Sequence, residues 1–88
     1  MNMTPRLSHA RRLRAFEKKI NSFREIIEAK ENSTILSLKQ NLDKLKRTEQ
    51  WLRLLIRDGV IDVGSCEPYQ EALHYIEEEI NKQLSTFQ

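Results

Sequence analysis

The sequence predicts an all-α protein, in which a long antiparallel helical hairpin is joined by a third helix. Two observations lead to this prediction. Charged residues make up 32% of the 88 positions, with only two Gly and two Pro, a balance that favours surface helices over sheet or disorder. Apolar side chains also recur at helical spacing in three segments separated by capping or turn residues. Residues 1–88 are therefore expected to form a single small three-helix, coiled-coil-like domain.

The first helix is predicted at about residues 5–31. Pro5 suits a first helical position, with Thr4 or Ser8 as a candidate N-cap. Apolar residues then follow one another at spacings of 3, 4, 3 and 4, which is the pattern of a heptad seam. The seam consists of Leu13, Phe16, Ile20, Phe23 and Ile27.

The second helix is predicted at about residues 34–58. Its expected seam consists of Ile35, Leu38, Leu42, Leu45, Leu52 and Ile56, with Glu49 standing where an apolar residue was due. Near its end, Trp51, Leu54 and Leu55 lie off this seam, so the end is apolar on nearly every side and needs more than one neighbour. Gly59 supplies the stop, in the left-handed conformation that helix C-caps favour.

A loop over residues 59–66 and a third helix over about 67–85 complete the chain. Val60, Ile61 and Val63 predict that the loop is pinned to the end of the bundle. Ser65 or Glu67 is expected to cap the helix, and Pro68 falls in its first turn, where a missing N–H has no cost. The predicted apolar stripe is Tyr69, Leu73, Ile76, Ile80, Leu84 and Phe87.

The junction between the first two helices decides whether the chain is a bundle or a rod. The seam skips from Ile27 to Ile35, one position more than a heptad, which local unwinding of a continuous helix would absorb. Asn32, Ser33 and Thr34 are poor in helix interiors and good at caps, which favours a turn. We therefore expect the hairpin, with the rod as the alternative.

The composition also limits the location and the chemistry of the protein. The chain contains no run of about 18 apolar residues and no signal peptide pattern, which predicts an intracellular protein, cytoplasmic or nuclear, without a membrane span. Cys66 is the single cysteine, so no internal disulfide forms. Glu71 and His74 have a metal-ligand spacing, but no second such pair exists. With no phosphate-cradling glycine loop either, we expect no cofactor, no metal and no enzyme activity.

The charge is distributed unevenly along the chain. Residues 1–20 carry six basic side chains and one acid, whereas residues 60–88 carry one base and six acids. The basic end offers candidate phosphate contacts at Arg11, Arg12, Arg14, Lys18 and Lys19. No aromatic residue falls among these positions to stack on bases, which weakens the nucleic-acid interpretation.

The function predicted from these patterns is that of a non-enzymatic, helical protein–protein interaction module or adaptor. A chain this short forms a marginal core, so oligomerisation as a homodimer, or docking of a helical partner, would complete it. The expected interface combines seam residues with the Trp51 region: Leu13, Phe16, Ile20, Phe23, Trp51, Leu54 and Leu55. The alternative is a small nucleic-acid-binding regulator that uses the basic first helix.

Overall fold

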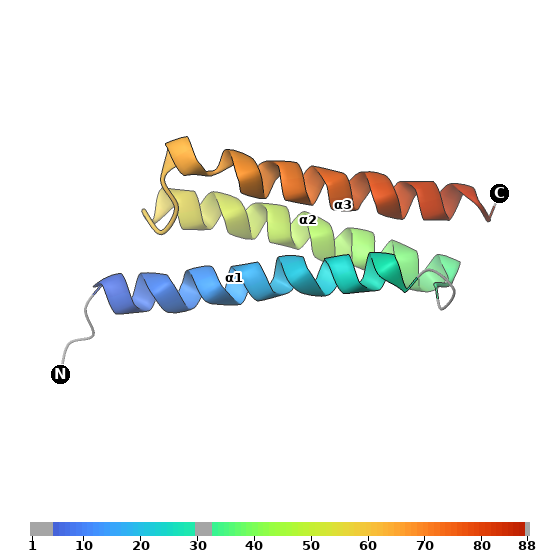
Figure 1. Ribbon diagram of the computed structural model, residues 1–88, viewed down its shortest axis with the longest axis horizontal. Coiled ribbons are helices and arrows are strands. Elements are labelled where there is room, and N and C mark those ends of the chain that lie inside the picture. The colour runs from blue at the N-terminus through green and yellow to red at the C-terminus, as the bar shows by residue number, and fades with distance from the viewer. Residues whose placement is uncertain (1–4, 30–32, 88) are drawn as a thin grey trace.

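The computed structural model describes residues 5–29 and 33–87, with residues 5–8 by their backbone alone. Three helices lie side by side, α1 (Pro5–Glu28), α2 (Ile35–Arg57) and α3 (Glu67–Ser85), and a short 3₁₀ turn, η2 (Val63–Ser65), precedes α3. Successive helices run in opposite directions (Figure 1). The all-α class and the hairpin are thus confirmed.

The overall dimensions exclude the rod. A continuous helix through both segments would be about 75 Å long at 1.5 Å per residue, whereas the longest extent of the Cα trace is 53 Å. The predicted turn, residues 31–34, falls partly outside the described residues. The predicted first helix was also too long: α1 ends at Glu28, and the expected residues 30 and 31 lie outside the described ranges.

α2 begins at a reciprocal cap. The Thr34 backbone is extended, and its Oγ1 accepts a hydrogen bond from the Ser37 amide at 3.0 Å. The Ser37 hydroxyl lies 2.9 Å from the Thr34 amide, from which it accepts in return. Each side chain therefore satisfies a donor that a helix start leaves unpaired. This cap places the start of α2 at Ile35, one residue after the predicted boundary at 34.

The end of α2 confirms the predicted role of Gly59. Gly59 has a φ of +76°, its amide donates to the Ile56 carbonyl at 3.1 Å, and the Val60 amide donates to Leu55 at 2.8 Å. These two bonds form a Schellman motif, in which a left-handed residue turns the chain back over the last carbonyls. Residue 58 is therefore the C-cap rather than the last helical residue.

The loop is pinned to the bundle in part. Ile61 is buried and Val60 packs against the core, as expected, but Val63 is 75% exposed in η2, so its predicted burial was wrong. Neither Ser65 nor Glu67 caps α3, because Cys66 occupies the N-cap position without a capping side-chain bond. Pro68 lies in the first turn, as predicted.

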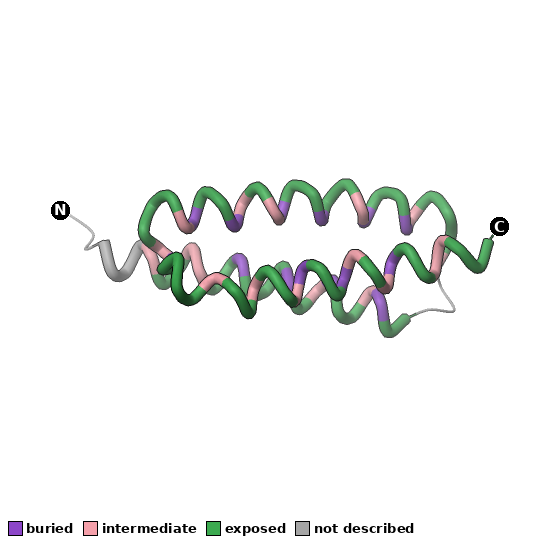
Figure 2. Tube along the Cα trace, turned by 90° about the horizontal axis from the view of Figure 1, so that it is seen from above, coloured by how far each residue is buried: buried purple, intermediate pink, exposed green. Residues whose placement is uncertain are grey.

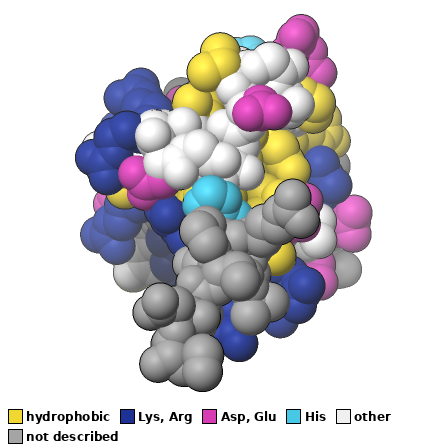
Figure 3. Space-filling model, turned by 90° about the vertical axis from the view of Figure 1, so that its left-hand side faces the viewer, with side chains coloured by type: hydrophobic (Ala, Val, Ile, Leu, Met, Phe, Trp, Pro, Cys, Tyr) yellow, Lys and Arg dark blue, Asp and Glu magenta, His cyan; other side chains and the backbone are white. Residues whose placement is uncertain are grey.

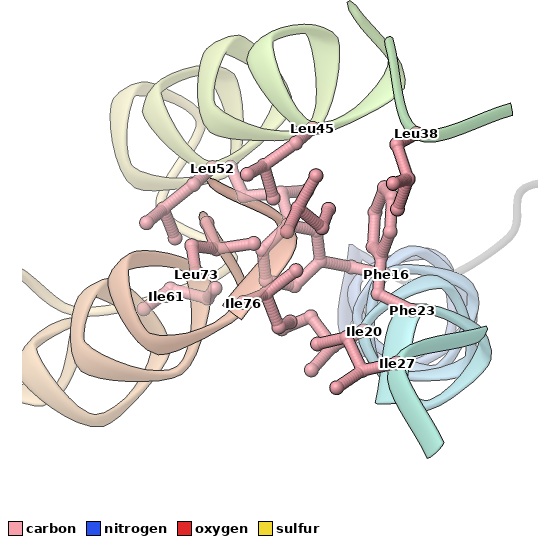
Figure 4. Packing of buried hydrophobic residues seen from close by; sticks show 12 residues of the cluster. Phe16, Ile20, Phe23, Ile27, Leu38, Leu45, Leu52, Ile61, Leu73 and Ile76 are labelled. Atoms are coloured by element: carbon pink, nitrogen blue, oxygen red, sulfur yellow. The ribbon is translucent and has the colours of Figure 1, made fainter. Parts of the chain in front are cut away.

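Side chains from all three helices point toward one another in the core (Figure 4), and the buried positions recur along each helix (Figure 2). On α1 the predicted seam is buried, apart from the half-buried Leu13. On α3 the core residues are Leu73, Ile76 and Ile80, while Phe87 is 47% exposed. The predicted α1 seam and the centre of the α3 stripe therefore belong to the core.

The seam predicted for α2 is buried in part: Leu38, Leu45 and Leu52 lie in the core, Leu42 and Ile56 pack against it, and Ile35 is 44% exposed. The helix also buries Asn41, Thr48 and Leu55, which the predicted seam did not include. Hydrophobicity alone predicts a seam that avoids the polar Asn41 and Thr48, but α2 must face α1 and α3 at once. Thr48 tolerates burial because its hydroxyl donates to the Lys44 carbonyl at 2.8 Å.

The charge asymmetry of the sequence becomes an asymmetry between helices. α1 carries seven basic residues and three acidic ones, α2 six and two, and α3 one and five, so the first two helices are each +4 and the third is −4. In the end view, Lys and Arg are most concentrated at the left, with others at the right and bottom, and most Asp and Glu lie at the top and right (Figure 3). No helix in the described ranges is both long and apolar enough to cross a bilayer.

Candidate functional site

The residues predicted as a partner interface are divided between core and surface. Phe16, Phe23 and Leu55 are at most 1% exposed, and Ile20 is also buried. Leu13 and Trp51 are half-buried at the edge of the core, and Leu54 is 44% exposed. A partner could reach the four buried residues only if the bundle opened, so the accessible part of this prediction is limited to Leu13, Trp51 and Leu54.

The residues predicted to contact phosphate also differ in their exposure. Arg11, Arg14, Lys18 and Lys19 are exposed, whereas Arg12 is half-buried and its Nη2 donates to Asp58 Oδ2 at 2.8 Å. Hydrogen bonds from Arg12 and then Arg57 hold the pKa of Asp58 below its ordinary value. Arg12 therefore has a partner within the fold, and it links α1 to the end of α2.

A basic groove runs between α1 and α2. It has a volume of about 220 Å³, and its walls are formed by Lys19 of α1 and by Lys44, Arg47, Thr48 and Trp51 of α2. Sequence reasoning included Lys19 and Trp51 in separate sites and missed Lys44 and Arg47. The spacing of residues 44, 47 and 51 places them on one helical face, a signal that would have found the α2 wall.

The indole of Trp51 packs against a cluster of aromatic side chains. Its ring packs edge-on against Phe16, with centroids 5.3 Å apart and planes at 80°. Phe16 also contacts Tyr69 of α3 in an edge-on arrangement, at 5.6 Å. One buried phenyl ring thus joins aromatic side chains from the other two helices, in the geometry that such rings prefer.

The other two interhelical grooves carry mixed charge. Between α1 and α3, the groove is lined by Glu17, Arg24 and Tyr69 among others. The Tyr69 hydroxyl donates to Glu17 Oε2 at 3.1 Å, and burial, followed by this bond, raises the pKa of Tyr69. Between α2 and α3, the lining includes Glu49 and Arg53. Opposite charges within each groove offer an ionic ligand no net attraction.

An apolar groove lies where α2 begins and α3 ends. Ile35, Leu84 and Phe87 line it with Lys39, and its volume is about 250 Å³. Ile35 and Phe87 are 44% and 47% exposed, and the neighbouring Leu36 is 67% exposed. This terminal groove, formed by Ile35, Lys39, Leu84 and Phe87, concentrates apolar side chains at the surface.

The candidate metal residues Glu71 and His74 are exposed, whereas the candidate thiol, Cys66, is partly buried. His74 Nε2 is 2.6 Å from Glu78 Oε1, and both side chains are more than half exposed. Within the described part of the chain, no three His, Cys, Asp or Glu side chains are grouped as metal ligands. The Cys66 thiol donates to the Val63 carbonyl at 3.0 Å, which supports the turn before α3.

Comparison of the chain with protein-family models, curated proteins and solved structures gave no match. The surface chemistry of the bundle is therefore the basis for assigning a function.

Proposed function

We propose that this protein is a non-enzymatic helical interaction module that associates with a second copy of itself through the terminal groove. The observation that carries the proposal is the exposure of Ile35, Leu36 and Phe87 at one end of the bundle. Covering apolar surface is favourable by about 25 cal/mol per Å². Among the described residues that line the groove, Lys39 is the one charged residue, so apolar contact dominates.

A second copy is the occupant that this patch and the size of the chain favour. An apolar patch is complementary to itself, and a two-fold axis would cover it on both chains at once. An 88-residue chain gains more from such a contact than a large domain would, because its own core is small. Self-association is thus proposed here as it was expected from the sequence, but through the terminal groove rather than through the heptad seams, which are buried within the bundle.

Nucleic-acid binding by the first helix alone has less support. Arg12 is held by Asp58, and Glu17, Glu25 and Glu28 interrupt the positive charge of α1. The candidate contacts on this helix thus form no continuous phosphate-binding surface.

The test is the mass of the protein in solution as its concentration rises, measured by sedimentation equilibrium. We expect a monomer–dimer equilibrium that the double substitution Ile35→Ser/Phe87→Ser abolishes. The matched control is Val63→Ser/Tyr75→Ser, which removes two hydrophobic residues that are 75% and 55% exposed elsewhere on the surface. A wild-type protein that stays monomeric at millimolar concentration, or equal effects of the two double variants, would refute the proposal.

A further inference from the structure

The groove between α1 and α2 carries more positive charge than the other grooves described above. Three basic side chains, Lys19, Lys44 and Arg47, line it, and no carboxylate from the described part of the chain does. The ion pairs found among the described residues involve Arg12, Arg57, His74 and Lys82, so none of them neutralises the three basic residues of this groove. The groove therefore presents positive charge that is open to a ligand.

The same groove contains an aromatic surface held in place. Trp51 is half-buried, and its contact with the fully buried Phe16 fixes the indole against the core. Thr48, which lies between Lys44 and Trp51 along the helix, is buried, so this stretch of α2 packs against the rest of the bundle. The indole is thus positioned before any ligand arrives, which reduces the entropy lost on binding.

Tertiary packing creates this combination. Lys19 lies 25 residues before Lys44 in the sequence, and the hairpin brings both to the same groove. Arg11 and Lys18, both exposed on α1, add positive charge to that helix. The aromatic side chain that the basic N-terminal cluster lacks in the sequence is supplied by the neighbouring helix.

We propose that the α1–α2 groove binds single-stranded nucleic acid, with phosphates at Lys19, Lys44 and Arg47 and a base against the exposed part of Trp51. Single strands are bound without sequence preference by surfaces that combine positive charge with aromatic platforms, because every base has a π-face. A run of acidic residues in a peptide would use the three charges but would give the indole no aromatic face to stack on. This site shares no lining residue with the terminal groove, so it is independent of the proposed self-association.

Trp51 is the single tryptophan of the chain, so its fluorescence reports on this groove without a label. The probe is an oligothymidylate of about 12 nucleotides, within the length range that small single-strand sites cover. We expect quenching that saturates in 50 mM salt. Three phosphate contacts predict a slope of about −2 in log K against log salt, so 200 mM salt should weaken binding about 20-fold.

Two double variants distinguish binding in this groove from general electrostatic attraction to the protein. Lys44→Gln/Arg47→Gln should weaken binding at least about tenfold, in line with the loss of two of three phosphate contacts. The matched control, Lys46→Gln/Arg53→Gln, removes one Lys and one Arg from exposed positions of the same helix outside this groove and outside the terminal groove, and binding should stay within about twofold. Circular dichroism establishes that each variant is folded.

Several outcomes would overturn the proposal. One is unchanged fluorescence with up to about 100 μM oligonucleotide, the weak end of non-specific affinity. Another is an equal loss of affinity in both double variants, which would indicate diffuse charge attraction. Equal quenching by polyglutamate of the same length would assign the groove to acidic peptides. Equal affinity for duplex DNA would mean that no base reaches Trp51.

Discussion

The guanidinium of Arg12 donates to the carboxylate of Asp58 at 2.8 Å, and this contact joins α1 to the C-cap of α2. Hydrogen bonds from Arg12 and Arg57 lower the pKa of Asp58 from 3.8. A lowered folded-state pKa stabilises the protein above the unfolded-state value, and this contribution is lost as the pH falls through the folded-state pKa. The pair therefore stabilises the bundle at neutral pH and ceases to do so in acid.

Replacing Asp58 by Asn should make stability less dependent on pH below 3.8. The measurement is the urea midpoint at pH 7 and at several values below pH 4, for wild type and Asp58→Asn. Wild type should lose more stability over this interval than the variant does. Asp62→Asn, which alters an exposed carboxylate of the neighbouring loop, serves as the control and should behave like wild type.

The two glycines should respond differently to alanine. Gly59 has a φ of +76°, so Gly59→Ala should cost about 1–2 kcal/mol of stability, although nothing lies within 4 Å of the added Cβ. Gly64 also has open space at this position and no positive φ. Gly64→Ala should therefore be neutral or stabilising by up to about 1 kcal/mol, through the unfolded state. Similar urea midpoints for the two variants would contradict this account.

Loss of the Thr34 cap should destabilise α2. Thr34→Ala removes the acceptor for the Ser37 amide and should cost about 1 kcal/mol in urea unfolding. Thr34→Ser keeps the hydroxyl and should stay close to wild type. If Ser and Ala had the same effect, the capping hydrogen bond would contribute nothing measurable.

Truncation of Phe16 should be among the most damaging substitutions. This side chain is fully buried and contacts both Trp51 and Tyr69, so Phe16→Ala should cost about 3–5 kcal/mol. That loss approaches the whole stability of a small domain, so helical circular dichroism should melt at a much lower temperature. Tyr75→Ala, at a 55% exposed position, should leave the melting temperature nearly unchanged.

A substitution at Thr48 should raise the stability of the protein rather than lower it. Its buried hydroxyl donates to a carbonyl of its own helix, a pattern that slightly disfavours helices. Thr48→Val keeps the shape and exchanges the hydroxyl for a methyl group, which should raise stability by about 0.5–1 kcal/mol. A urea midpoint for Thr48→Val below that of wild type would show that the hydroxyl stabilises the protein more than the methyl group that replaces it.

Much of the fold could be predicted because its determinants are local. The 3–4 spacing from Leu13 to Ile27 defined the α1 seam, and Gly59 and Pro68 marked a helix end and a helix start by their backbone preferences. The α2 seam could not be predicted to the same accuracy. A helix that packs against two neighbours buries positions such as Thr48, whose side-chain bond makes burial possible despite its polarity.

The sequence by itself determined the number of helices, their approximate limits and the charge that each carries, because propensity, capping and charge belong to residues and their near neighbours. Tertiary structure alone decided which surfaces exist. It buried Phe16 and Leu55, paired Arg12 with Asp58, and brought Lys19 to the same groove as Trp51. Such contacts depend on the orientation of helices that lie far apart in the chain, and that orientation is set by how the three apolar faces pack together.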